Sequence, residues 1–184
     1  MGPKENLLAV ARRCLQQGEF VFSSGIKSSF YLDCRLITTQ PFGLFSVGKI
    51  VFVLVSGGDV RAVGGPATGA IPIVSAVVLE SYRAQRPLSG FWVREATKSH
   101  GTQKLIEGNL ETSWQVAVVE DVISSGGSVL RAIRVVEEQG CQVAKVVSLM
   151  DWQLGGSERL RQRGYDFVSV LTGEAKTGKI WISK

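Results

Sequence analysis

The 184-residue chain has little of what several classes of protein require. It holds a single histidine, His100, and only three cysteines, Cys14, Cys34 and Cys141, which are far apart. An odd number of scattered cysteines argues against a disulfide framework and against a zinc site, so we expect reduced core thiols in a cytoplasmic protein. No apolar stretch is long enough to cross a bilayer, so no membrane partner is expected. Residues 5–17 predict an amphipathic helix rather than a signal peptide.

Concentrated positive charge is also missing. The formal net charge is +5, but the basic residues are scattered, and the densest group is Arg159, Arg161 and Arg163. These arginines lack the interleaved aromatic residues of a single-strand binding platform, so no nucleic-acid partner is expected. A moderately positive surface would equally attract a small anionic substrate.

Apolar segments of strand length alternate with segments of helical periodicity over most of the chain. With 45% hydrophobic residues, residues 1–184 predict one domain with an ample core. The alternation indicates an α/β fold with a central parallel sheet flanked by helices on both faces. We expect a strand–turn–strand unit at 19–33, strands at 62–64, 91–94, 115–119, 143–149 and 167–171, and helices at 5–17, 41–57, 71–84, 129–139 and 157–162. The turns after the first four of these core strands should share one cleft, because ligands of such sheets bind beyond the carboxyl ends of the strands.

The segment from Val116 to Leu130 is the most informative part of the chain. An apolar run ends in two adjacent carboxylates, Glu120 and Asp121, and a Ser-Ser-Gly-Gly-Ser turn at 124–128 opens into a helical pattern. Backbone N–H groups and hydroxyls at a helix N-terminus suit a phosphate. The carboxylates would repel a phosphate, so ribose hydroxyls or a magnesium ion held partly by its substrate are their expected partners. The alternative is an ordinary strand–loop–helix with a glycine-rich connection; a dinucleotide fingerprint is excluded because no G-x-G-x-x-G is present.

Two further loops follow expected strands and contribute to the same cleft. The small residues at 64–72 let the backbone approach a ligand, and Thr68 with the N–H groups of Gly69 and Ala70 would suit pyrophosphate, although a tight turn without a ligand has the same composition. Residues 94–108 are long, polar and cationic, which favours a closing lid over a solvated hairpin.

Together these segments resemble the orotate phosphoribosyltransferases, a family of the type I phosphoribosyltransferase fold. Residues 116–130 resemble the phosphoribosyl-diphosphate (PRPP) motif of that fold, and residues 94–101 resemble the family's R-K-x-x-K-x-H-G lid. Residues 18–35, GEFVFSSGIKSSFYLDCR, resemble its entry segment, which phosphoribosyltransferases acting on purines do not share. The resemblance implies an N-terminal hood over residues 1–40 and a mobile lid over 94–108. It also implies conversion of PRPP and orotate to orotidine 5-monophosphate and pyrophosphate, in de novo pyrimidine (UMP) biosynthesis.

The resemblance assigns the site residue by residue. It implies catalytic roles for Lys98, His100 and Asp121. The residues implied in PRPP binding are Arg94, Lys98, His100, Thr68, Gly69, Glu120, Asp121, Val122, Ile123, Ser124, Ser125, Gly126, Gly127 and Ser128. The residues implied or expected in orotate binding are Lys27, Tyr31, Leu32, Ser124 and Trp152. The implied cofactor is Mg²⁺, held mainly by PRPP, with Asp121 as the one candidate protein ligand. A homodimer is implied, with each lid acting in the neighbouring subunit's site.

The chain departs from the family pattern at four positions. Glu95, Gly69 and Ser23 stand where some or many members have lysine, and Trp152 stands where many have an arginine that holds the orotate carboxylate. Lys27, or the backbone N–H groups near Ser28 and Tyr31, would have to replace that arginine. We expect Trp152 to line the base site instead.

Two alternative functions follow from these departures. One is a phosphoribosyltransferase for another base, uracil or a purine. The other is a regulator of the same fold that senses PRPP or a nucleotide. The lid cations argue against a sensor, because sensing requires no stabilisation of a leaving group.

Overall fold

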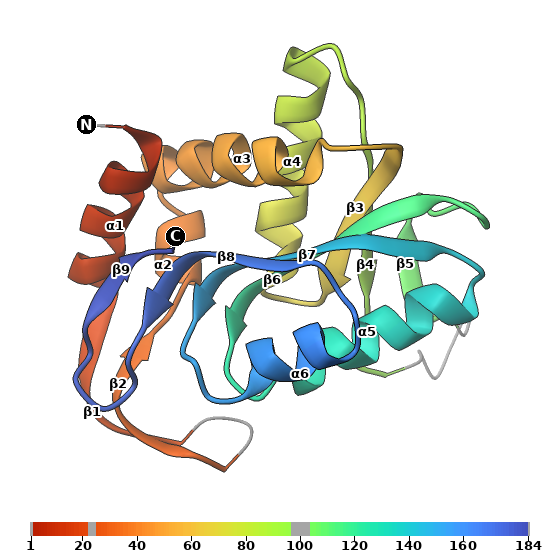
Figure 1. Ribbon diagram of the computed structural model, residues 1–184. Coiled ribbons are helices and arrows are strands. Elements are labelled where there is room, and N and C mark those ends of the chain that lie inside the picture. Colours follow the sequence, from red (N-terminus) through yellow and green to blue (C-terminus); the bar gives the residue numbers. More distant parts are fainter. Residues whose placement is uncertain (1, 22–24, 97–103, 184) are drawn as a thin grey trace.

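The chain forms one large sheet with helices on both faces and a separate two-stranded hairpin (Figure 1). The computed structural model describes residues 2–21, 25–96 and 104–183. The helices are α1 Pro3–Cys14, α2 Arg35–Thr38, α3 Pro41–Val55, α4 Ala70–Arg83, α5 Gly127–Glu138 and α6 Gly156–Gln162. The strands are β1 Leu15–Val21, β2 Lys27–Leu32, β3 Val60–Pro66, β4 Ser89–Val93, β5 Ile106–Gly108, β6 Gln115–Ile123, β7 Gln142–Asp151, β8 Phe167–Gly173 and β9 Ile180–Ile182.

The large sheet has the order β5-β4-β3-β6-β7-β8-β9. The neighbouring pairs among β4, β3, β6, β7 and β8 are parallel, as predicted. The two outer strands, β5 and β9, are antiparallel to their neighbours and were not predicted. Each has three residues, which is too short for hydrophobic alternation to identify a strand.

Strand β6 lies at the centre of the sheet, and its alternate residues are buried on opposite faces. Ala117 and Val119 belong to the core under α3 and α4, whereas Val116 and Val118 belong to the cores under α5 and α6. Figure 1 shows α3 and α4 on one side of the sheet and α5 and α6 on the other. Burial on both faces explains why β6 is an almost continuous apolar run.

The N-terminal segment forms the predicted helix and hairpin with a different boundary. Helix α1 ends at Cys14, three residues earlier than predicted, because residues 15–17 pair with Leu32, Tyr31 and Phe30 of β2. The three cysteines are buried and free. No helix in the described part of the chain is both long and apolar enough to cross a membrane.

Candidate active site

The adjacent carboxylates lie within β6 rather than in a loop, which corrects the predicted end of this strand at residue 119. β6 continues to Ile123 because its last residues pair with β7, with Glu120 opposite Ser148. Side chains of consecutive strand residues point to opposite faces. Glu120 accepts a 2.7 Å hydrogen bond from the Ser128 hydroxyl on the α5 side, and the Asp121 carboxylate lies against Gly69 at the β3–α4 turn. The two carboxylates therefore have different neighbours.

The pKa values of both carboxyl groups are raised above their ordinary values. Burial raises the pKa of Glu120, which is 5% exposed, and the negative charge of Asp121 raises it further. Burial also raises the pKa of Asp121, although the backbone N–H of Val122 donates to its carboxylate at 2.8 Å. Neither group has a cation in contact among the described residues. Buried acids with raised pKa values are typical of functional sites.

The loop after β6 has the conformation expected of a phosphate site. Gly126 has a φ of 78° and precedes α5, which begins at Gly127, two residues earlier than predicted. Ser124 and Ser125 are half-buried, whereas Gly127 and Ser128 are exposed. The first N–H groups of a helix have no partner within the helix, so the start of α5 can offer them to an anion.

The β3–α4 turn brings its small residues close to β6. A side chain at Gly65 would overlap the carbonyl oxygen of Val119, so only glycine lets the two strands approach there. The following peptide bond between Ala67 and Thr68 is cis. The exposed Thr68 and half-buried Arg94 line one cavity of about 560 Å³. The structure therefore brings together two of the predicted diphosphate-binding residues, from the turn and from the start of the lid.

The start of the lid is fixed to β5. The Arg94 N–H donates to the carbonyl of Leu105 at 2.8 Å, and its guanidinium lies 3.5 Å from the Glu107 carboxylate. Strand β5 lies inside the predicted 94–108 loop and shortens it to the residues before Ile106. Lys98 and His100, the two predicted catalytic cations, lie outside the described residues.

The hairpin places some of the predicted orotate residues near the carboxylates. Lys27 is exposed, and half-buried Tyr31 stacks on Phe20 with a centroid separation of 5.3 Å. Burial raises the pKa of Tyr31, and the charges of Asp33 and Asp121 add to the increase, so Tyr31 lies within electrostatic range of Asp121. The Leu32 side chain is fully buried in the core, and the implied position of this residue beside the base stays a prediction.

Trp152 is also in the core. Its side chain is 1% exposed, and a Cβ atom added at Gly173 would lie 3.0 Å from the ring. No ring face remains for a pyrimidine, so the prediction that Trp152 lines the base site is wrong. Trp152 directly follows Asp151, the last residue of β7, and the core closes over it.

Arg35, which was not among the predicted site residues, carries a positive charge that acts on Asp121. Its guanidinium forms a two-pronged ion pair with Asp33, at 2.8 and 2.9 Å, and this hydrogen bonding lowers the pKa of Asp33. The positive charge of Arg35 also opposes the rise in the pKa of Asp121. The D-C-R spacing in the entry segment was the available signal, because an acid and a base two residues apart can pair at a helix start.

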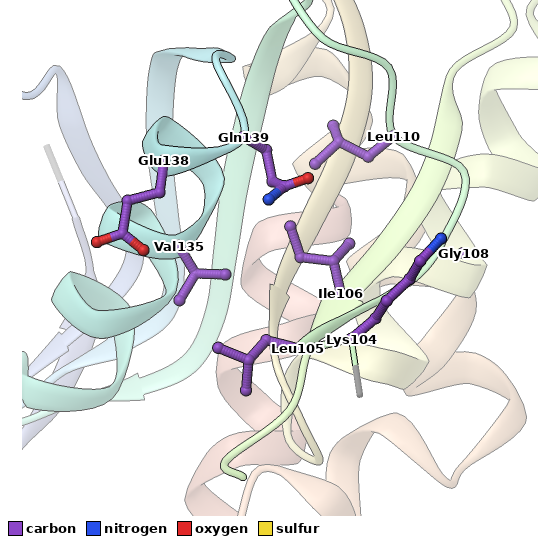
Figure 2. A pocket seen from close by; sticks show the side chains of 8 residues that line it. All are labelled: Lys104, Leu105, Ile106, Gly108, Leu110, Val135, Glu138 and Gln139. Atoms are coloured by element: carbon purple, nitrogen blue, oxygen red, sulfur yellow. The ribbon is translucent and has the colours of Figure 1, made fainter. Parts of the chain in front are cut away.

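A second cavity, of about 480 Å³, lies at the C-terminal end of the predicted lid (Figure 2). It is bordered by the β5 region and by the end of α5, and its lining consists of Lys104, Leu105, Ile106, Gly108, Leu110, Val135, Glu138 and Gln139. None of the predicted site residues lines it.

Comparison with known proteins identifies the family. No protein-family model matches the chain. It is 38% identical over 164 residues to an orotate phosphoribosyltransferase of Rhodopirellula baltica, covering 86% of this chain and 85% of that protein. It is 37% identical over 174 residues to the enzyme of the same name from Methanocaldococcus jannaschii, covering 94% and 96%. The chain belongs to the orotate phosphoribosyltransferase family.

Solved structures of orotate phosphoribosyltransferases agree with the type I phosphoribosyltransferase fold. The Mycobacterium tuberculosis enzyme in complex with Fe(III) dicitrate has a TM-score of 0.80 and 32% identity, over 94% of this chain and 97% of that one. The same enzyme in complex with PRPP has a TM-score of 0.76 and 30% identity, over 94% and 96%. An adenine phosphoribosyltransferase, at 16% identity and a TM-score of 0.65, shows the shared fold alone.

Two departures from the orotate phosphoribosyltransferase pattern have a structural explanation. A side chain at Gly69 would overlap the Asp121 carboxylate, so the lysine of some members would displace that acid here. At position 152 the surroundings are apolar and closed, so an arginine would be a buried charge. Ser23 lies outside the described residues, and nothing in the structure explains Glu95.

Proposed function

We propose that the chain transfers the phosphoribosyl group of PRPP to orotate, producing orotidine 5-monophosphate and pyrophosphate. The observation that carries the proposal is the convergence of three segments on one end of the sheet, within a chain 38% identical to an orotate phosphoribosyltransferase. These segments are the β6–α5 loop, the β3–α4 turn and the start of the lid.

Each segment suits one part of PRPP. Residues 124–128 would bind the 5-phosphate through their N–H groups and the hydroxyls of Ser124 and Ser125, since the Ser128 hydroxyl donates to Glu120. Asp121, which faces the β3–α4 turn, would accept hydrogen bonds from the ribose hydroxyls, and the cavity between Thr68 and Arg94 would hold the diphosphate. Glu120 is held by Ser128 and would mainly support the loop.

The reaction forms a bond between N1 of orotate and C1 of the ribose and breaks the bond from C1 to the diphosphate oxygen. Positive charge develops on the ribose ring, by analogy with glycosyl transfer, and negative charge develops on the leaving group. The Asp121 carboxylate would offset the positive charge on the ribose. Arg94, with Lys98 and His100, would offset the negative charge on the diphosphate. Orotate has an acidic N1–H, so the protein needs no dedicated general base.

Mg²⁺ fits this site only if substrate supplies most of its ligands. Among the described residues no group of three or more His, Cys, Asp or Glu side chains could hold a metal. The half-buried Asp121 carboxylate is the candidate protein ligand, and phosphate oxygens and water would supply the remaining ligands. When bound, the ion would neutralise the charge that gathers on the diphosphate.

Orotate would bind between the hairpin and the end of β6. Tyr31 would contact the base, and Ser124 would lie beside it. The exposed Lys27 and the backbone N–H groups near Ser28 and Tyr31 are the candidates for holding the carboxylate, since Trp152 is buried. The Ser28 hydroxyl donates to the carbonyls of Phe30 and Ala175, so it is already engaged.

A homodimer with lids acting in trans would complete the site. Helices α3 and α4 expose apolar side chains that a second copy would cover, namely Phe42, Phe45, Val53, Leu79 and Tyr82. Mixing Lys98→Ala and Asp121→Asn chains tests this arrangement, because some hybrid dimers would contain one site with neither defect. Recovery of activity supports it, and confirmed subunit exchange without recovery contradicts it.

The proposed reaction is tested by measuring pyrophosphate release from PRPP with orotate, uracil and hypoxanthine in separate reactions. Pyrophosphate release with orotate, and not with uracil or hypoxanthine, supports the proposal. Robust release with uracil or hypoxanthine and none with orotate identifies a transferase for another base. Binding of PRPP without release in any reaction identifies a sensor.

A further inference from the structure

The segment after β7 forms hydrogen bonds with the backbone of the proposed phosphate loop. Three consecutive carbonyls of the loop, those of Ile123, Ser124 and Ser125, each accept a hydrogen bond from this segment. The donors are the N–H of Trp152 at 3.0 Å, the N–H of Gly156 at 2.9 Å and the guanidinium of Arg159 at 3.0 Å. The β7–α6 connection and α6 therefore bind every carbonyl of the loop from Ile123 to Ser125.

These bonds fix the direction of the loop's N–H groups. In a trans peptide unit the carbonyl of one residue and the N–H of the next point in opposite directions. With the three carbonyls directed at the 152–159 segment, the N–H groups of Ser124, Ser125 and Gly126 point away from it. No group in the described part of the chain accepts a hydrogen bond from these three N–H groups. They are therefore available to an anion.

Close packing of two backbones supports the same arrangement. A Cβ atom at Gly156 would lie 2.6 Å from the carbonyl oxygen of Ser124 and 2.7 Å from the nitrogen of Gly126. Trp152 anchors the segment in the core, which gives this residue a structural function in place of contact with the base. Of the three donors, only that of Arg159 is a side chain, so it alone can be removed without changing the backbone.

We propose that Arg159 is a positioning residue for the 5-phosphate of PRPP. It acts through Ser125, by holding the carbonyl that orients the N–H of Gly126 and by restraining the loop before a phosphate binds. This inference rests on the proposed function. A restraint on phosphate binding acts on the ground state and the transition state alike, so its loss should raise the KM for PRPP and leave kcat nearly unchanged.

The test compares Arg159→Met with Arg163→Met, which removes the same charge from the exposed end of the same helix. Loss of one hydrogen bond corresponds to a roughly two- to tenfold change in an equilibrium constant. Arg159→Met should weaken binding of ribose 5-phosphate, measured by calorimetry, and raise the KM for PRPP by about this factor. Arg163→Met should change neither, and Arg159→Lys, which keeps a charged donor, should recover part of the loss.

The calorimetric measurement separates this inference from the proposed reaction. Weaker binding of ribose 5-phosphate by Arg159→Met, with Arg163→Met unchanged, supports the inference even if orotate proves not to be the acceptor. Equal affinities for wild type and Arg159→Met, or equal losses in both methionine variants, overturn it. A fall in kcat at unchanged KM also overturns it, because a restraint on the phosphate loop cannot produce that result.

Discussion

The carboxylate of Glu120 on β6 accepts a 2.7 Å hydrogen bond from the hydroxyl of Ser128 in the first turn of α5. This contact joins the two ends of the proposed phosphate loop. It also distinguishes Glu120 from Asp121, whose carboxylate lies beside Gly69. Two adjacent acids that belong to one motif therefore have different expected functions.

Asp121→Asn should impair catalysis much more than Glu120→Gln. A charge-assisted hydrogen bond contributes about 1.5–3 kcal/mol, so loss of the Asp121 charge should lower kcat/KM roughly 10- to 150-fold. Glutamine at 120 can still accept from Ser128, and we expect a change of less than about fivefold. Steady-state kinetics with PRPP and orotate measure kcat/KM for both variants. The control is Asp166→Asn, which alters a surface ion pair with Lys145. A larger loss for Glu120→Gln than for Asp121→Asn would reverse the assignment.

Glu120→Gln should stabilise the ligand-free protein in a pH-dependent manner. Burial and the neighbouring charge of Asp121 raise the pKa of Glu120 in the folded state, so folding favours the protonated acid. The folded protein therefore loses stability as the pH rises from the unfolded-state pKa through the folded-state pKa. The variant lacks this loss, so its Tm should exceed that of wild type by a few degrees at about pH 8 and by little at about pH 4. A Tm difference that does not change with pH would contradict this account.

Trp152→Ala should destabilise the fold without a selective effect on orotate. Truncation of a buried tryptophan costs about 3–5 kcal/mol, and Trp152→Phe should cost less because part of the ring volume remains. Urea denaturation measures the loss, and the ratio of the KM values for orotate and PRPP should stay near that of wild type. A stable Trp152→Ala protein with specifically weakened orotate binding would restore Trp152 to the base site.

Gly69→Ala should lower activity by displacing Asp121. Gly69 has φ −61° and ψ −37°, which alanine adopts readily, so backbone strain is not expected. The added Cβ would overlap the Asp121 carboxylate, and we expect kcat/KM for PRPP to fall about tenfold if one charge-assisted contact is lost. Gly57→Ala is the matched control because nothing lies within 4 Å of its Cβ position. Unchanged kinetics in Gly69→Ala would show that Asp121 can move without consequence.

The sequence predicted the parallel core of the sheet because strands such as β6 are buried on both faces and read as continuous apolar runs. It did not predict β5 and β9, whose pairing depends on neighbours far along the chain. The position of Glu120 and Asp121 in the motif was predicted, but their different neighbours, Ser128 and Gly69, depend on β6 continuing to Ile123. Trp152 was misassigned because residue type alone does not reveal whether the core closes over a side chain at a strand end.

Competition among three bases tests the claim that orotate is the acceptor. The purified protein would be incubated with PRPP, Mg²⁺ and equal concentrations of orotate, uracil and hypoxanthine, with an Asp121→Asn reaction in parallel, and the nucleotide products would be separated and identified. We expect orotidine 5-monophosphate as the dominant product of the wild type and a much reduced yield from the variant. Uridine or inosine monophosphate as the dominant product, with no orotidine monophosphate, would contradict the claim.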